Sequence, residues 1–332
     1  MISQVCHLPY YLNDERCNVV SIYETRKSLI DYFEKNFDQI EIIRDYHSII
    51  EDNSIDAVIV SMPRETNSFF GYETVMAKKD IFIEKPMAYR YEDALKIHSL
   101  VVKNEICFGI GYMKKHDPGL IKSKKIFYEA VESEMYGSLE KIIFYNNYGK
   151  YEYSPPIHKK PEESRDFRYA AWPAYPEFIP KNLQSNYSDF INIGVHNINL
   201  IHYFFPSDEI VFGNTFIDHD KLNALMTFKG IPLELRFNKS NQDGWSEGIK
   251  FIFSEGLIEV SLPCPMNQKG TSKIICKSKK KIEEIKVPKS PWQFETQAKN
   301  FISSLFNEEL LVSSSFNGVE DMHLIKQIWS NL

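Results

Sequence analysis

A lysine at the end of a strand-like run is the residue of this sequence best placed for proton chemistry. The apolar run at 81–83 ends in Glu84-Lys85-Pro86. In an open parallel sheet the carboxyl ends of the strands border the ligand crevice, so we expect Lys85 to face a ligand there. Burial and neighbouring groups tune the proton affinity of a lysine, which lets Lys85 exchange a proton with a substrate hydroxyl. Pro86 restricts the backbone just after it.

The elements that position this lysine alternate between strand and helix over residues 1–118. Residues 58–60 form an unbroken β-branched run, which is typical of a central parallel strand. Alternation of this kind predicts an α/β domain with a doubly wound, Rossmann-type sheet that binds a dinucleotide. The expected strands are 19–23, 40–43, 56–61, 81–84 and 107–111, and the expected helices are 4–13, 28–37, 46–51, 68–77 and 91–103.

Strand-like runs dominate the remainder of the chain, 119–332. Gly230, Gly256 and a lysine-rich stretch at 277–281 separate several of these runs and predict hairpin turns. The pattern predicts a second, α+β domain with a large, mainly antiparallel open sheet and helices on one face. Strands are expected at 139–148, 210–217, 224–228, 232–237, 249–253, 257–261, 273–276 and 282–287, and helices at 120–134, 191–205, 292–306 and 316–331.

The dinucleotide fingerprint G-x-G-x-x-G is absent, although the segments that normally follow it are present. The acid that binds the adenosine ribose stands about 20 residues beyond the glycines, and Glu24 ends a strand-like run 21 positions after Ser3. If Met1 and Ile2 take the variable positions, Ser3 takes the third small-residue position. We therefore expect the first strand and the G-x-G to be missing, as with a start codon assigned at an internal methionine. The alternative is a rearranged sheet edge without a cofactor.

Glu24 also bears on the choice of cofactor. A carboxylate at this position accepts hydrogen bonds from the ribose 2′-hydroxyl and repels a 2′-phosphate, which favours NAD over NADP. Arg26 and Lys27 follow closely and keep NADP open as an alternative.

Four segments, taken together and in order, resemble the Gfo/Idh/MocA family of oxidoreductases. The resemblance extends over nearly the whole chain, including the two C-terminal helices. It implies an NAD(P)-dependent enzyme that transfers hydride between nicotinamide and a hydroxyl or keto carbon of a sugar, nucleotide sugar or cyclitol. The segments are IDAVIVSMP at 55–63, KDIFIEKPMA at 79–88, IGYMKKHDP at 110–118 and NIGVHNIN at 192–199.

The resemblance assigns roles to the residues at these motif positions. Lys85 and His196 are the implied proton-handling residues, with Asn192 beside the substrate hydroxyl. The implied substrate residues also include Tyr112. The implied cofactor-binding residues are Ser3, Glu24, Ser61, Pro63, Glu84 and Lys85.

Two positions depart from the family pattern. Asn192 and Asn199 stand where the family has aspartates, four residues before and three residues after His196. An asparagine can orient a hydroxyl but cannot take its proton, so proton transfer shifts to Lys85 and His196. The NIGVH form resembles family members that oxidise the 3-hydroxyl of nucleotide sugars in surface-polysaccharide synthesis. The alternative for His196, on an apolar helix, is a buried structural histidine, which is the interpretation preferred for His202 and, as helix-end packing, for His7.

The segment 162–180 is rich in arginine, aromatic residues and proline and lacks a strand or helix period. Long irregular loops in compact domains are usually functional. Arginines grip phosphates and aromatic rings stack on sugars or bases, so Arg165, Arg168 and Trp172 are candidates for cofactor or substrate contacts. The alternative is a surface loop that packs on its own aromatic residues.

Composition excludes several classes of protein. The net charge of −6 gives no general attraction to nucleic acid or to an anionic membrane, and no apolar run is long enough to cross a bilayer. The five cysteines are scattered without metal-ligand spacing, so we expect no metal site, no disulfide framework and a cytoplasmic location.

The run 224–228 is apolar on both of its alternating faces. A second copy stacking on the open sheet would bury the excess, which predicts a homodimer or homotetramer. A different class of function also stays open at this point. The retained Lys85 and His196 favour the enzyme, whereas Asn192 and the absent glycines favour a nicotinamide-binding regulator or pseudoenzyme with the same fold.

Overall fold

The computed structural model describes residues 1–332 apart from 151–157, 164–171 and 174. The chain divides into two compact units. Unit 1 comprises Met1–Gly111, Pro155–Pro176 and Phe294–Val319, and unit 2 comprises Tyr112–Ser154, Glu177–Gln293 and Glu320–Leu332. Unit 1 therefore combines the first 111 residues with two segments from later parts of the sequence.

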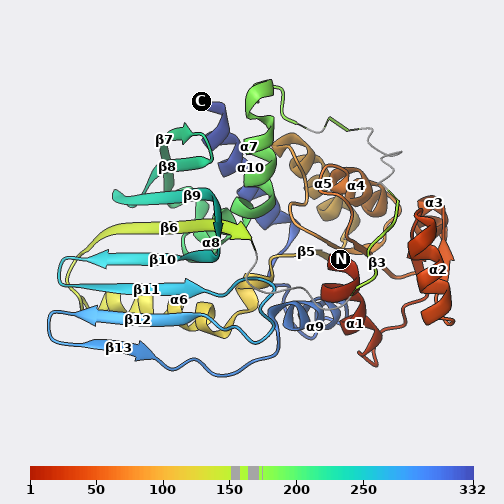
Figure 1. Ribbon diagram of the computed structural model, residues 1–332, viewed down its shortest axis with the longest axis horizontal. Helices are drawn as coiled ribbons and strands as arrows, with labels where there is room; N and C mark the ends of the chain where they lie inside the picture. Colours follow the sequence, from red (N-terminus) through yellow and green to blue (C-terminus); the bar gives the residue numbers. More distant parts are fainter. Residues whose placement is uncertain (151–157, 164–171, 174) are drawn as a thin grey trace. The chain divides into compact units, whose positions relative to one another are not determined.

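Unit 1 contains two parallel sheets with helices between their strands (Figure 1). Strand β4 is apolar and fully buried at Ile81, Phe82 and Ile83, as expected for a parallel strand covered on both faces. This arrangement confirms the predicted Rossmann-type fold. One sheet pairs β1 (Ser21–Tyr23) with β2 (Glu41–Ile43), and the other has the order β3 (Ala57–Val60), β4 (Asp80–Ile83), β5 (Phe108–Ile110).

The helices of unit 1 follow the predicted alternation. A π-helical turn, η1 (Ser3–His7), leads into α1 (Leu8–Leu12), where a single helix had been expected at 4–13. Proline at position 9, in the first turn of α1, fits this division because a helix tolerates proline there. The others are α2 (Lys27–Asn36), α3 (Tyr46–Glu51), α4 (Asn67–Met76) and α5 (Tyr91–Asn104).

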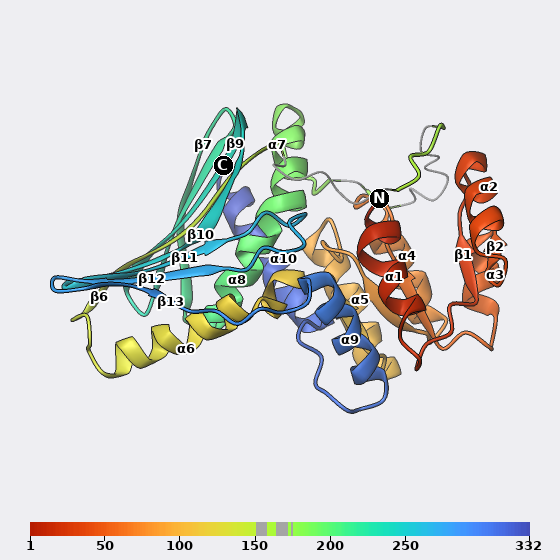
Figure 2. The same cartoon turned by 60° about the horizontal axis from the view of Figure 1, so that its bottom comes forward.

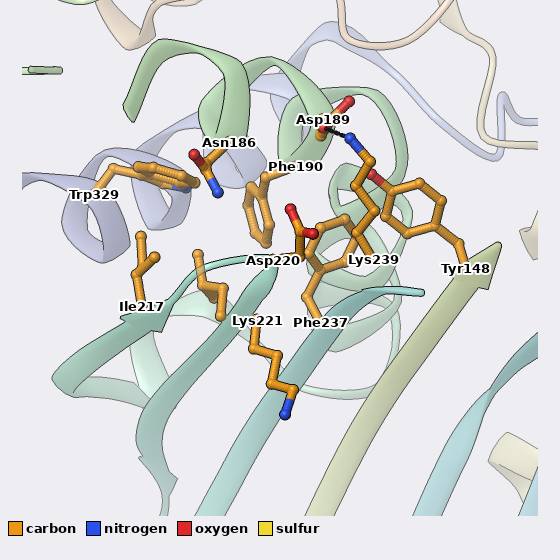
Figure 3. Close-up of a pocket in the computed structure, with 11 residues that line it drawn as sticks. Tyr148, Asn186, Asp189, Phe190, Ile217, Asp220, Lys221, Phe237, Lys239 and Trp329 are labelled. Atoms are coloured by element: carbon orange, nitrogen blue, oxygen red, sulfur yellow. Dashed lines mark hydrogen bonds and ion pairs between the residues drawn. The ribbon is translucent and has the colours of Figure 1, made fainter. Parts of the chain in front are cut away.

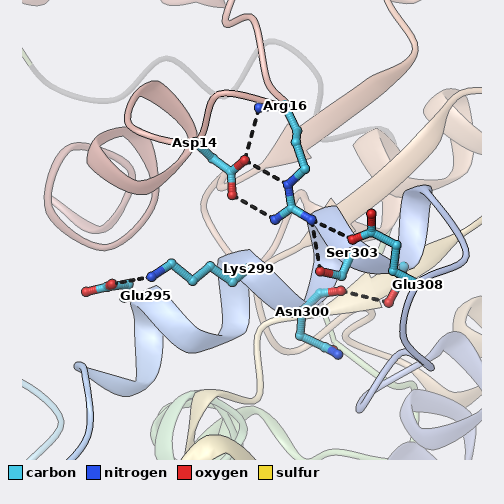
Figure 4. A network of polar contacts seen from close by, with 8 residues as sticks. Asp14, Arg16, Glu295, Lys299, Asn300, Ser303 and Glu308 are labelled. Atoms are coloured by element: carbon cyan, nitrogen blue, oxygen red, sulfur yellow. Dashed lines mark hydrogen bonds and ion pairs between the residues drawn. The ribbon is translucent and has the colours of Figure 1, made fainter.

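Helix α9 (Gln293–Leu305) returns to unit 1 and completes its core. Ala298, Phe301 and Ile302 pack with Tyr11 and Phe82 in one buried cluster. Polar contacts extend this attachment at the surface (Figure 4). Arg16 binds Asp14 and also donates to Ser303 at 3.1 Å and to Glu308 at 2.7 Å. Because these ions are partly exposed, the apolar cluster supplies most of the attachment energy.

Unit 2 is built on an eight-stranded sheet, and all of its strand pairs are antiparallel except β6 with β9. This confirms the predicted large, mainly antiparallel sheet. Lys229 and Gly230 both have positive φ, as a tight hairpin turn between β8 and β9 requires. The order is β13 (Ile282–Ile285), β12 (Lys273–Ser278), β11 (Gly256–Leu262), β10 (Trp245–Phe253), β6 (Leu139–Lys150), β9 (Ile231–Asp243), β8 (Lys221–Phe228), β7 (Ile210–Asp218).

Helices cover one face of this sheet, among them α6 (Pro118–Glu132) and α8 (Val195–Phe204) (Figure 2). Aromatic rings fill the space between. Phe127 of α6 lies 4.2 Å from Phe251 of β10, measured between ring centroids. Helix α7 (Gln184–Asp189) and a π-helical turn, η4 (Phe190–Gly194), lead into α8, and α10 (Ser315–Ser330) ends the chain's secondary structure.

Along the described helices there is none long and apolar enough to span a bilayer. A cluster of three or more histidine, cysteine or carboxylate side chains fit to hold a metal ion is also absent from the described residues. The five cysteines are free thiols.

Candidate active site

Lys85 lies directly after β4, and contacts on both sides hold its backbone. The Asn67 side-chain amide donates to the carbonyl oxygen of Glu84 at 2.9 Å and to that of Pro86 at 3.1 Å. The Lys85 backbone N–H donates to Oε2 of Glu84 at 3.2 Å. Lys85 itself is half-buried. Asn67, at the start of α4, was not singled out from the sequence, because a contact 17 residues away leaves no periodic signal.

The Glu84 carboxylate points into the protein. It is buried and lies 2.9 Å from Nε2 of His7 in η1. A Cβ atom on Gly111 would lie 3.0 Å from the Glu84 carboxyl carbon, so glycine leaves the space that this carboxylate occupies. The neighbours described for the Glu84 carboxylate, His7 and Gly111, are residues of this chain. Its contact with a cofactor therefore remains a prediction.

Glu24 follows β1, at the position expected for the ribose-binding acid. Its carboxylate accepts hydrogen bonds from the backbone N–H of Thr25 and from the backbone and guanidinium of Arg26, at 2.7–3.0 Å. Burial alone would raise the pKa of Glu24, but the hydrogen bonds from Arg26 outweigh it and lower that pKa. Glu24 is therefore ionised and paired, and Arg26 weakens the repulsion it exerts on a phosphate.

The other predicted cofactor residues are placed as follows. Ser61 and Pro63 follow β3, and the carbonyl oxygen of Pro63 accepts a hydrogen bond from Thr66 at 2.8 Å. Ser3 is the first residue of η1. The polar groups of unit 1 fit a nicotinamide dinucleotide, with a carboxylate after β1 for ribose hydroxyls and an ammonium group after β4 for the nicotinamide ribose.

Trp172 packs against the helices of unit 1. Its ring lies 5.4 Å from that of Tyr72, and Nζ of Lys96 lies 5.0 Å from the centre of the Trp172 ring. Both partners belong to helices α4 and α5 and lie outside the segment 162–180, so a ligand contact of Trp172 remains a prediction. Arg165 and Arg168 lie outside the described residues.

Asn192 and His196 occupy successive turns of the helical stretch in unit 2. Asn192 lies in η4, and π-helical turns of this kind are frequent at functional sites. His196 is 6% exposed, and its ring lies 6.1 Å from that of Tyr112 in an edge-on arrangement. The structure thus brings together the predicted substrate residues Tyr112 and His196 within unit 2.

A buried polar network that the sequence did not suggest begins at the residue after His196. Asn197 donates to Oε1 of Glu247 at 3.2 Å and accepts from Asn146 at 3.2 Å. Lys114 also pairs with Glu247, and Trp245 donates to it. Burial lowers the pKa of Lys114, although its contact with Glu247 opposes this shift.

Asn199 and His202 share one buried carboxylate. Asp321 of α10 accepts from the Asn199 amide at 2.8 Å and lies 2.8 Å from Nδ1 of His202. The structural interpretation of His202 is confirmed. Asp321 is fully buried and was missed because it stands more than 100 residues from its partners.

A shallow pocket of about 280 Å³, including its open mouth, lies on unit 2 between α7, η4 and the strands (Figure 3). Phe190, Phe237 and Trp329 contribute rings to it, and Asp189 pairs with Lys239 at 2.7 Å beside them. None of the predicted catalytic residues is among those that line it. The predicted catalytic residues Lys85, Asn192 and His196 therefore lie outside this pocket.

Comparison with known proteins bears directly on unit 1. Residues 1–112 match the family model described as "Oxidoreductase family, NAD-binding Rossmann fold". The chain is 32% identical over 89 residues to the uncharacterized oxidoreductase YrbE of Bacillus subtilis (strain 168), covering 26% of each protein. It is 26% identical over 112 residues to a scyllo-inositol 2-dehydrogenase (NAD(+)) of the same organism, covering 34% of this chain and 31% of that one. These matches span only about a quarter to a third of the relatives' length.

The fold of the whole chain recurs in a solved structure. KijD10, a 3-ketoreductase from Actinomadura kijaniata in complex with NADP and TDP-benzene, has a TM-score of 0.77 at 17% identity. The likeness covers 99% of this chain and 94% of that one. At this identity it establishes the fold alone. Residues 1–112 thus resemble the Gfo/Idh/MocA oxidoreductase family, with its NAD-binding Rossmann fold, and the whole chain shares the fold of KijD10.

Proposed function

We propose that this protein is an NAD(P)-dependent dehydrogenase or reductase acting on a CH–OH or keto carbon of a sugar, nucleotide sugar or cyclitol. The observation that carries the proposal is Lys85, held after β4 by Asn67 and Glu84. Relatives named as inositol dehydrogenases and a fold neighbour named as a 3-ketoreductase support this substrate class. NAD is the favoured cofactor, with NADP as the alternative.

The nicotinamide, when bound, supplies or accepts the hydride. Lys85 and His196 exchange the proton of the reacting hydroxyl, and Asn192 orients that hydroxyl through its amide. Tyr112 contributes to the substrate site through its contact with His196. Ser3, Glu24, Ser61, Pro63 and Glu84 are the further residues assigned to the cofactor side.

The decisive experiment is a single-turnover measurement at 340 nm with protein in excess of cofactor. NAD and NADP are each paired with myo-inositol, scyllo-inositol and TDP- and UDP-hexoses. We expect reduced nicotinamide with at least one pair, and its formation should be about 100-fold slower or more in the Lys85→Ala variant. Binding of cofactor and sugar together without any absorbance change would contradict the enzyme and support a nicotinamide-binding regulator, which Asn192 favours.

We further propose a cytoplasmic homodimer or homotetramer that works in surface-polysaccharide or related carbohydrate metabolism. Support for the assembly comes from the uncovered face of the unit 2 sheet. Its paired positions run Leu225, Glu234, Ile143, Lys250, Glu259 and Ile275 across neighbouring strands. Apolar side chains thus alternate there with charges that neutralise one another, as Lys250 does with Glu259 at 3.1 Å.

A second copy stacked on this face would bury its apolar side chains. Sedimentation at micromolar concentration should therefore give a dimer or tetramer, and Leu225→Glu, which sets a second carboxylate opposite Glu234, should shift it toward the monomer. A wild-type monomer under these conditions would contradict the proposal.

A further inference from the structure

We propose that His7 is a positioning residue for Lys85 and acts through the carboxylate of Glu84, an inference that rests on the proposed function for the role of Lys85. The two oxygens of this carboxylate have different partners. Oε1 lies 2.9 Å from Nε2 of His7, and Oε2 accepts the Lys85 backbone N–H at 3.2 Å. His7 thus orients the Glu84 carboxylate, which in turn holds the Lys85 backbone.

The peptide groups around Lys85 transmit this constraint. The Asn67 amide holds the carbonyl oxygens of Glu84 and Pro86, so the backbone is anchored before and after the lysine. The Lys85 N–H donates to the Glu84 carboxylate. If the Glu84 carboxylate rotates, this N–H loses that acceptor, and the start of the Lys85 side chain moves with its peptide group.

Burial makes the contact with His7 consequential. The exposed fractions of His7 and Glu84 are only 3% and 9%, and Gly111 lies against the carboxylate. A buried carboxylate oxygen that loses its donor pays a desolvation cost that water cannot relieve. The carboxylate therefore has a strong preference for the orientation in which His7 donates to it.

The surroundings of the His7 ring also assign its tautomer. An ionised carboxylate only accepts hydrogen bonds, so the proton must be on Nε2. Nδ1 is buried and has no hydrogen-bond partner among the described residues. A proton on Nδ1 would be a buried donor without an acceptor, and the ring packs edge-on against Phe82 at 5.5 Å and Phe294 at 6.4 Å. The geometry points to the neutral Nε2–H form.

The first test compares two substitutions of His7. His7→Phe keeps an aromatic ring beside Phe82 and removes the donor, whereas His7→Gln retains an N–H near the position of Nε2. We expect His7→Phe to lower kcat about tenfold, the low end of the effect of a hydrogen bond to a charged group. KM for cofactor and substrate should stay within about twofold because the His7 ring is buried within unit 1, away from solvent. His7→Gln should recover most of kcat.

A second readout needs no substrate. Brief acylation with N-hydroxysuccinimide acetate, followed by peptide mass spectrometry, measures the reactivity of the Lys85 amine. Lys103 of α5, which is exposed, serves as the internal control. We expect the Lys85 rate to change at least threefold in His7→Phe and to return toward wild type in His7→Gln, with Lys103 unchanged. Equal Lys85 rates in wild type and His7→Phe would overturn the proposal.

Two further measurements keep the test decisive if His7→Phe fails to fold. Glu84→Gln has one acceptor oxygen for two donors, so it should reproduce the altered Lys85 reactivity. In the wild-type protein, ¹⁵N NMR of the imidazole should identify the Nε2–H tautomer of His7, and an Nδ1–H tautomer would refute the assignment. Absence of turnover with His7-dependent Lys85 reactivity would reject the proposed function alone. Turnover with both kcat and Lys85 reactivity indifferent to His7 would reject the positioning role alone.

Discussion

Lys85 and His196, the two residues assigned to proton transfer, are supported in different ways. At Lys85 the backbone is held because the Asn67 amide donates to the carbonyl oxygens of Glu84 and Pro86, and the Lys85 N–H donates to the Glu84 carboxylate. His196 lies on a helix whose next residue, Asn197, contacts the buried charge of Glu247. The difference teaches that the lysine can be altered at little cost to folding, whereas the surroundings of the histidine are tied to the stability of unit 2.

The largest effect on stability is expected where the buried Lys114 loses its counterion, Glu247. Glu247→Ala leaves the Lys114 ammonium uncompensated, and breaking a buried pair typically costs about 3–5 kcal/mol. Urea unfolding of the full chain should show this loss. The matched control is Glu259→Ala on the neighbouring strand β11, where partly exposed pairs with Lys250 and Lys277 predict a loss of about 1 kcal/mol or less. Equal losses at the two glutamates would remove the contrast.

The second effect concerns the lysine. Lys85→Ala should lower kcat by about 100-fold or more, the usual scale for a positioned acid–base group. Its unfolding free energy should stay close to wild type, because Asn67 and Glu84 bind backbone groups that alanine retains. NAD binding should remain largely intact, because backbone groups and Glu24 supply most of the contacts expected for the cofactor. Stopped-flow absorbance and isothermal titration provide the measurements, with Lys103→Ala as the control. A large loss of stability would show that the Lys85 side chain contributes to folding, as the surroundings of His196 do.

The third effect is a pH dependence of the free energy of unfolding, which arises from His116 in unit 2. Burial, with the neighbouring charge of Lys115, lowers the pKa of His116 to about 4. In the unfolded chain His116 binds a proton near pH 6.5, whereas in the folded protein it binds one only near pH 4. The free energy of unfolding therefore falls as the pH drops from about 6.5 to 4, by up to about 1.4 kcal/mol per pH unit. His116→Gln should flatten this slope in urea titrations at successive pH values. An unchanged slope would contradict the assignment.

Glu24 in unit 1 titrates in a different window. Its pKa lies below the ordinary value because the hydrogen bonds from Arg26 outweigh burial. A lowered carboxylate pKa gives stability that is present above the unfolded pKa and is lost only as the pH falls through the folded pKa. This contribution therefore begins to decline only below about pH 4.5, at the acid end of the range in which His116 acts.

The smallest effect concerns cofactor choice. Glu24→Gln removes the negative charge and releases the Arg26 guanidinium, so NADP affinity should rise about tenfold, equivalent to about 1.4 kcal/mol. NAD affinity should fall a few-fold through the weaker ribose contact. Titration of both cofactors measures the ratio, and Asp31→Asn on the exposed side of α2 is the control. A parallel change for NAD and NADP would argue against a role of Glu24 in discrimination.

The sequence predicted the features that depend on neighbours along the chain. Strand β4 is apolar because both of its faces are covered, and Glu24 and Lys85 follow strands at the ends where ligands bind. In β9 the buried side chains of Leu233 and Leu235 likewise alternate with Glu234 along the chain. Such signals arise from backbone periodicity, which a sequence records directly.

The sequence could not predict contacts made by the tertiary fold. His7 and Glu84 are 77 residues apart, and Lys114 and Glu247 are 133 apart, so no local pattern links either pair. His7 was assigned to packing because a single histidine in an apolar helix has that meaning more often than any other. Its ring does pack on Phe82, but its Nε2 also meets a carboxylate that only the folded chain brings near.

The return of α9 to unit 1 has a consequence for biosynthesis. Phe82 leaves the ribosome long before Phe301 and Ile302, the residues that complete its buried cluster. At about 5–20 residues per second, the delay is roughly 10–40 s. During that interval the apolar surface around β4 is translated but unfinished, and it is a natural target for chaperones. Folding of unit 1 must therefore conclude after unit 2 has almost wholly emerged, although unit 1 contains the start of the chain.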